Sequence, residues 1–215
     1  MGGIHDEHVE WAVVSRLKAM LEEPPKTTFN VTQSFALFTA ILLWTKNRTW
    51  VGGNGEDRPA WFSAADHAAR DAREALRHAR ICDAPWSLSR VSPRIVAVDE
   101  LGAGPHPINF DFAEMSAEDF FKWLRDALAH GDGRTIRPVH KPSAQGNRTL
   151  LAGFAINFAE HRGADRELRL ELHHRDMKRL GAILADQFCQ SLSGGDLYFE
   201  EQAGAAPITE LKPTS

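Results

Sequence analysis

An arginine and a histidine five residues apart, Arg125 and His130, are the side chains in this sequence best suited to carry out chemistry. Histidine exchanges protons near neutral pH, and a positioned proton donor or acceptor accelerates a reaction by about 10²–10⁴. Arginine keeps its charge, and its planar fork of donors matches the oxygens of a phosphate. The pair therefore predicts phosphodiester chemistry. Asp126 is a third candidate, either as an acceptor for His130 or as a carboxylate that orients Arg125.

The pair lies at the end of a predicted amphipathic helix that covers about residues 116 to 130. Ser116 is suited to cap its first turn, and Gly131 is suited to end it, because glycine takes a positive φ without steric cost. Five residues on an ideal helix turn through about 140°, so Arg125 and His130 do not share one stripe. The apolar face of this helix consists of Phe120, Phe121, Leu124, Ala127 and Leu128.

A simpler interpretation of the same residues stays open. Arg125 then pairs with a nearby Asp or Glu, His130 only caps the last carbonyls of the helix, and Asp126 is an ordinary surface charge. Two further arginines, Arg134 and Arg137, follow directly with His140 and Lys141 in a Gly/Pro-containing loop. We expect Arg134 and Arg137 to contact an RNA backbone, although solvated loop charges explain them equally well.

The run Arg125-Asp126-x-x-x-His130 resembles the Arg-polar-x-x-x-His signature of HEPN domains, and the extension to Ala127-Leu-Ala-His-Gly131 strengthens the match. The segment 132–138 also resembles a plasmid-associated bacterial HEPN subgroup. One departure is Asp126, where many active members have asparagine. The resemblance covers the helical frame from about residue 5 to 193, and the specific motif covers residues 125 to 130.

The resemblance implies a small helical bundle that acts as a metal-independent ribonuclease, needs no cofactor and forms its cleft as a homodimer. Arg125 would stabilise the phosphate and His130 would move protons. It also implies a role as a toxin or defence effector, with an antitoxin or a nucleotidyltransferase as a possible partner. Because in-line cleavage needs groups on both sides of the phosphorus, a two-fold dimer would supply a second Arg/His pair. A non-catalytic HEPN-like module that binds RNA, nucleotide or protein is the alternative.

The rest of the chain predicts a mainly helical fold of about five helices. The third helix is rich in Ala, Arg and Asp, which indicates a solvated helix with a salt-bridged face that includes Arg73 and Arg77. Residues 94–98 form a brief strand in this prediction. The other predicted helices cover about residues 5–23, 32–46, 63–82 and 175–192.

Alternating apolar and polar residues predict a β-hairpin at about 149–173, between the fourth and fifth helices. A lone hairpin is marginal in water, so its apolar face must pack on the bundle or on a second subunit. We expect one domain over residues 1–195 and a mobile tail at 196–215.

Composition limits the classes of function further. The chain has 215 residues and a formal net charge of −4, which argues against a protein that coats polyanions non-specifically. Its start contains no apolar signal segment, and its longest apolar stretch, Phe35 to Trp44, is too short to span a bilayer. Cys82 and Cys189 carry no partner motif, which fits a reducing cytoplasm without excluding a disulfide. We therefore expect a cytoplasmic protein that does not associate with membranes.

Histidines suggest a third class of function, a metal-dependent helical-bundle enzyme. His5 and His8 lie three residues apart on the first helix, and His173 and His174 end the predicted hairpin. No HExxH or CxxC spacing accompanies them, so the expectation is that the chain holds no metal. Among the six tryptophans, Trp123 lies closest to the Arg/His pair, although tryptophans are more often core or interface anchors than base-stacking platforms.

Overall fold

The structure is a computed structural model, and it describes residues 9–24, 28–47, 70, 73–89, 94–97, 114–144, 146, 148–159 and 167–192. The predicted tail at 196–215 lies outside these residues, as do His5, His8 and the first part of the predicted third helix. Residues 73–78 are helical. The named elements are, in chain order, α1 (Val9–Glu22), α2 (Asn30–Asn47), β1 (Arg94–Ala97), α4 (Ala117–Ala129), β2 (Ile136–Pro142), β3 (Thr149–Ala159), β4 (Glu167–His173) and α5 (His174–Ser191).

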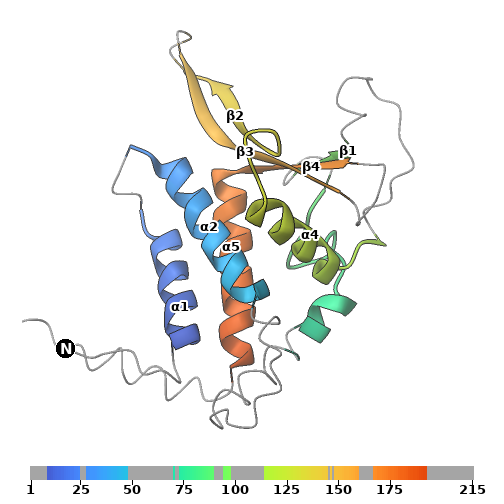
Figure 1. Cartoon of the computed structure of the whole chain (residues 1–215). Coiled ribbons are helices and arrows are strands. Elements are labelled where there is room, and N and C mark those ends of the chain that lie inside the picture. The colour runs from blue at the N-terminus through green and yellow to red at the C-terminus, as the bar shows by residue number, and fades with distance from the viewer. Residues whose placement is uncertain are drawn as a thin grey trace, which may run out of the picture.

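Three helices, α1, α2 and α5, pack side by side and form the helical layer (Figure 1). A glycine on α5 permits their close approach. A Cβ atom added at Gly181 would lie 2.6 Å from a methyl carbon of Leu21 on α1 and 3.4 Å from the Phe38 ring on α2. The absence of a side chain at Gly181 therefore lets α5 settle between the two neighbouring helices.

The strands form one antiparallel sheet in the order β1-β4-β3-β2, which lies across one end of the helical layer (Figure 1). The apolar face of the sheet packs on the helices through Ile156 on β3 and through Leu168, Leu170 and Leu172 on β4, all of which are buried. Helix α4 contacts both α2 and β3. It thus connects the helical layer to the sheet, and the candidate chemistry lies at its end.

The predicted hairpin is confirmed as β3 and β4, which pair in register from Gly153 opposite His173 to Ala159 opposite Glu167. The predicted brief strand is confirmed as β1. The predicted loop at 134–141 is wrong from Ile136 onward, because β2 pairs with β3 there. The fold is therefore a helical bundle with a four-stranded sheet rather than a bundle with one hairpin. Pro138 and Pro142 conceal β2 in the sequence, but an edge strand tolerates proline.

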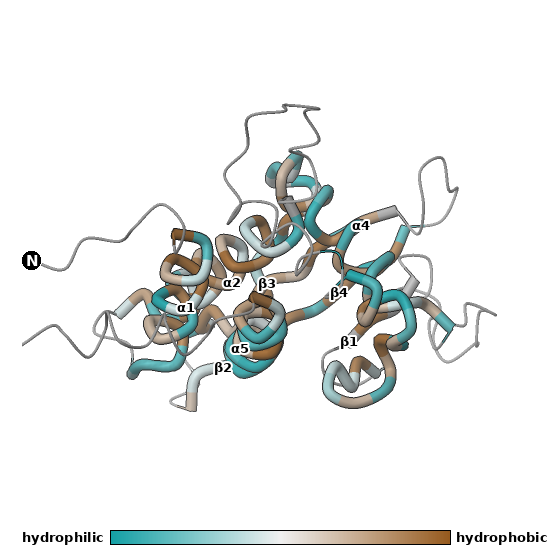
Figure 2. Tube along the Cα trace, turned by 90° about the horizontal axis from the view of Figure 1, so that it is seen from below, coloured by the Kyte–Doolittle hydropathy of each residue, from teal (hydrophilic) through white to brown (hydrophobic). Residues whose placement is uncertain are grey.

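The helices and the sheet share one hydrophobic core. Figure 2 shows α5 hydrophilic on its outer side and hydrophobic towards the other elements, and its buried positions include Met177, Leu180, Leu184 and Phe188. The longest apolar stretch of the sequence falls in α2. Among the described residues, none of the helices combines the length and apolarity that crossing a membrane requires. Cys82 and Cys189 are both free thiols, and burial raises the pKa of Cys189 to about 12.

Candidate functional site

Helix α4 begins and ends as its sequence predicts. The Ser116 hydroxyl accepts a hydrogen bond from the Asp119 N–H at 3.0 Å, and His130 is the C-terminal cap, whose N–H donates to the Asp126 carbonyl at 3.1 Å. The expected positive φ at Gly131 is wrong, since Gly146 is the only described glycine with a positive φ. Glycine is needed at 131 for space, because a Cβ there would lie 2.6 Å from the Ala127 carbonyl oxygen and from Ile136.

A groove of about 970 Å³ lies where the end of α4 meets the sheet, and we call it the α4 groove. Four of the five predicted site residues line it: Asp126, His130, Arg134 and Arg137. The other lining residues are Trp123, Ala127, Asp132, Thr135, Asn157, Phe158 and Glu167.

The structure places Arg125 on another side of α4. Its guanidinium Nε lies 3.0 Å from the Asp126 carboxylate, and 17% of its side chain is exposed. Arg125 follows Glu118 by seven residues, which is about two helical turns, so the two share one face of α4. Its charge also acts to lower the pKa of Lys46 on α2. Arg125 therefore faces the junction with α2 and contacts the groove indirectly, through Asp126.

The charges that line the α4 groove nearly balance. Asp126, Asp132 and Glu167 contribute carboxylates, and Arg134 and Arg137 contribute guanidinium groups. Arg134 donates from Nε and Nη2 to Asp132 at 2.9 and 2.7 Å and from its backbone N–H at 2.8 Å. These bonds lower the pKa of Asp132 to about 2. Each of these two carboxylates therefore has a cationic partner, Arg125 for Asp126 and Arg134 for Asp132.

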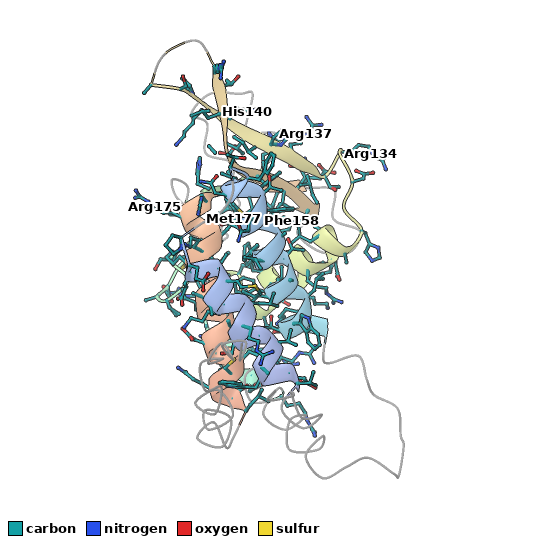
Figure 3. The ribbon with its side chains drawn as sticks, turned by 90° about the vertical axis from the view of Figure 1, so that its left-hand side faces the viewer. Arg134, Arg137, His140, Phe158, Arg175 and Met177 are labelled. Atoms are coloured by element: carbon teal, nitrogen blue, oxygen red, sulfur yellow. The ribbon has the colours of Figure 1, made fainter. Side chains whose placement is uncertain are left out.

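The predicted basic segment continues along the exposed edge strand β2. Figure 3 shows Arg134, Arg137 and His140 following one another along this strand and the chain that leads into it. The Nε of Arg137 donates to the Arg134 carbonyl at 3.4 Å. The arginines therefore extend the α4 groove onto the edge of the sheet, where their side chains are exposed.

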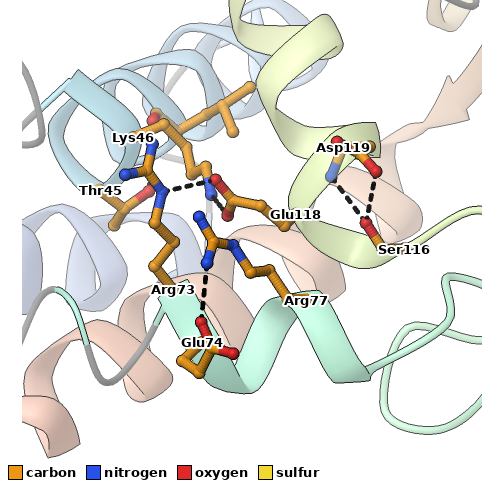
Figure 4. Close-up of polar contacts among 9 residues, drawn as sticks. Thr45, Lys46, Arg73, Glu74, Arg77, Ser116, Glu118 and Asp119 are labelled. Carbon is orange, nitrogen blue, oxygen red and sulfur yellow. Dashed lines mark hydrogen bonds and ion pairs between the residues drawn. The ribbon is translucent and has the colours of Figure 1, made fainter.

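A buried ionic cluster fixes the other end of α4 (Figure 4). The carboxylate of Glu118 accepts hydrogen bonds from Lys46 Nζ and, at 2.9 Å, from Arg73 Nε. Burial is the largest influence on Lys46 and lowers its pKa, whereas Glu118 acts to raise it. Arg77 makes the predicted surface pair with Glu74 at 2.9 Å, but Arg73 turns inward to α4. We refer to Lys46, Arg73 and Glu118 as the ionic cluster.

Sequence reasoning did not identify Asn157 and Glu167 as groove residues. They come from β3 and β4, and no local motif marks them, because only the pairing of the strands brings them to α4. Within the described part of the chain, no group of three or more His, Cys, Asp and Glu side chains has an arrangement that could hold a metal ion. No protein-family model matches the chain, and no curated protein or solved structure matches it either.

Proposed function

We propose that this protein is a HEPN-type endoribonuclease that cleaves RNA in the α4 groove as a homodimer, without a metal or cofactor. The observation that carries the proposal is the groove itself, which gathers His130 and Asp126 from α4 with Arg134 and Arg137 from the segment that follows. This combination offers one proton-transferring side chain and two phosphate-binding side chains within one concave surface.

The proposed reaction uses the 2′-hydroxyl of the RNA as the nucleophile. His130 takes the proton from this oxygen, which then bonds to the adjacent phosphorus. Arg137 stabilises the charge on the non-bridging oxygens, and Arg134 does so once the phosphate displaces Asp132 from it. The bond to the 5′ oxygen breaks, and that oxygen receives a proton from His130 of a second copy on the opposite side. The products are a 2′,3′-cyclic phosphate and a 5′-hydroxyl.

Arg125 has a positioning role in this proposal. Its guanidinium neutralises Asp126 at the wall of the groove, so the carboxylate repels an incoming phosphate less. This role differs from the direct phosphate contact that the family resemblance implies. It follows from the location of Arg125 on the α2 side of the helix and from its 3.0 Å contact with Asp126.

The proposal is tested by incubating a labelled RNA with the purified protein in the presence of a chelator. We expect cleavage that leaves a 2′,3′-cyclic phosphate, because the nucleophile belongs to the RNA. A 2′-O-methyl oligonucleotide of the same sequence should stay intact, since it lacks that nucleophile. Equal cleavage of RNA and DNA would rule out attack by the 2′-hydroxyl. Loss of all activity with the chelator would show that the enzyme needs a metal.

The role of Arg125 is tested by a double-mutant cycle with Asp126. Arg125→Ala is expected to slow cleavage at least about tenfold, because Asp126 is then an uncompensated charge beside the phosphate. Adding Asp126→Asn should restore most of the rate. The measurement is the single-turnover rate constant of all four proteins. If the double variant is as slow as Arg125→Ala alone, Arg125 acts on the phosphate directly or through the fold.

A non-catalytic RNA-binding module is the second candidate. Among the described residues that line the α4 groove, carboxylates outnumber guanidinium groups. This balance favours the binding module, because it weakens attraction for a phosphate. Binding of RNA with no cleavage by the wild-type protein distinguishes this candidate from the ribonuclease. The cellular role, as a toxin or a defence effector, follows only if cleavage is observed.

A further inference from the structure

A second pocket of about 540 Å³ lies at the other end of β2, where that strand meets the start of α5, and we call it the α5 pocket. Its lining residues come from β2, from β3, from the end of β4 and from the first turns of α5. The polar residues that line it are Lys141, His173, His174, Arg175, Asp176 and Lys178.

The lining of the α5 pocket is strongly cationic in a chain whose net charge is −4. Lys141, Arg175 and Lys178 carry full positive charges. Among the described residues that line the pocket, Asp176 is the only one with a carboxylate, and it accepts a hydrogen bond from the His173 N–H at 3.0 Å. The excess of positive charge therefore suits an anionic ligand.

Two of the cations are available to such a ligand. Lys178 Nζ donates to the carbonyls of Glu22 and Glu23 at 3.1 and 3.3 Å, which holds it in place. Lys141 and Arg175 are exposed, and the side chain of neither makes a hydrogen bond or an ion pair with the part of the chain that the structure describes. A ligand phosphate would give both of them a charged partner without breaking an existing ion pair.

Strand β2 connects this pocket to the α4 groove. Arg137 lines the groove and Lys141 lines the pocket, and four residues of an extended strand span about 13 Å. The register of β2 against β3 shifts between Val139 and His140, so the strand is irregular between the two sites. In Figure 3 the labelled residues Arg134, Arg137 and His140 follow β2, and Arg175 lies at the start of α5 beneath it. A single phosphate is too small to bridge this span, whereas an extended polynucleotide is not.

We propose that the α5 pocket is a phosphate subsite for the backbone of the same single-stranded RNA whose scissile phosphate lies in the α4 groove. This inference rests on the proposed function. Lys141 and Arg175 bind a backbone phosphate at a distance from the cleaved bond. The RNA between this subsite and the α4 groove lies along β2. Contacts of this kind position a nucleic acid and carry no base specificity.

The test measures binding of a fluorescent single-stranded 2′-O-methyl oligonucleotide, which cannot be cleaved, over a range of salt concentrations. Lys141→Gln/Arg175→Gln is expected to weaken binding about tenfold. The logarithm of the association constant falls with the logarithm of the salt concentration, and the variant should make this slope less steep by about 0.7 for each lost phosphate contact. Lys141→Arg/Arg175→Lys should retain the wild-type affinity, because both charges remain.

Arg16→Gln/Arg77→Gln is the matched control, since both of these arginines are exposed and line neither the groove nor the pocket. If wild type cleaves RNA but Lys141→Gln/Arg175→Gln binds the oligonucleotide as tightly as Arg16→Gln/Arg77→Gln, the subsite is overturned and the proposed function stands. If Lys141→Gln/Arg175→Gln alone loses affinity but wild type never cleaves, the subsite stands and the catalytic proposal fails. If inorganic phosphate shifts the NMR resonances of His174 but Lys141→Gln/Arg175→Gln binds the oligonucleotide with wild-type affinity, the pocket holds free anions and the proposal is overturned.

Discussion

Replacing His130 with alanine is expected to slow RNA cleavage by about 10²–10⁴ while the protein still binds RNA. The proposed mechanism gives this imidazole both proton transfers, one in each copy of the dimer, and His130 is the only histidine among the described residues that line the α4 groove. The side chain is exposed, and the hydrogen bond that caps α4 is made by the backbone N–H of residue 130, which alanine retains. The measurement is a single-turnover rate constant with RNA, beside the affinity for a 2′-O-methyl oligonucleotide.

His78→Ala is the matched control for this prediction. His78 is also an exposed histidine, and its ring pairs with Glu74 on the same helical stretch, at 3.1 Å. This variant should cleave RNA at the wild-type rate. A His130→Ala protein that cleaves as fast as His78→Ala would show that His130 transfers no proton in the rate-limiting step. A His130→Ala protein that no longer binds the oligonucleotide would instead indicate a role in binding.

The sequence predicted the positions of the groove residues because the information is local. A cap at Ser116 and a helix end at Gly131 determine where α4 stops, and the residues that follow it must emerge beside His130. The angle between Arg125 and His130 was also predictable from helical geometry, since about 140° separates them. The structure agrees with this angle by placing Arg125 towards α2 and His130 in the groove.

What the sequence did not reveal depends on contacts between distant segments. Strand β2 has two prolines and no regular alternation of apolar and polar residues, so nothing in its sequence indicated the pairing with β3. The ionic cluster was concealed for a similar reason. Arg73 was expected to lie on a solvated, salt-bridged face of its own helix, and nothing in that helix indicates a contact with Glu118. Their contact joins residues 45 positions apart.

Replacing Glu118 with glutamine is expected to lower the free energy of unfolding by about 3–5 kcal/mol. The substitution keeps the size of the side chain but leaves the ammonium of Lys46 buried without its carboxylate, and residues Glu118 and Lys46 are only 6% and 8% exposed. Arg73 loses the same partner, although its side chain, at 36% exposure, can still reach water. Urea denaturation at neutral pH measures the loss.

The effect should also depend on pH in a defined direction. Burial acts to raise the pKa of Glu118, but Lys46 and Arg73 together hold it below its usual value of 4.5. The carboxylate therefore contributes its full stability above about pH 4.5 and loses it as the pH falls through the lower pKa of the folded state. The difference in unfolding free energy between wild type and Glu118→Gln should accordingly shrink in acid.

Two comparisons separate the buried charge from other causes of instability. Asp119→Asn removes the same charge from the same helical turn at an exposed position, and it should cost no more than about 1 kcal/mol. Lys46→Met/Glu118→Leu removes both buried charges and should recover much of the loss, because an apolar pair avoids their desolvation. If Glu118→Gln and Asp119→Asn cost the same, the ionic cluster does not hold α4 against α2. In that case the rotation that directs His130 into the groove must come from the apolar face of α4 alone, from Phe120, Phe121 and Leu124.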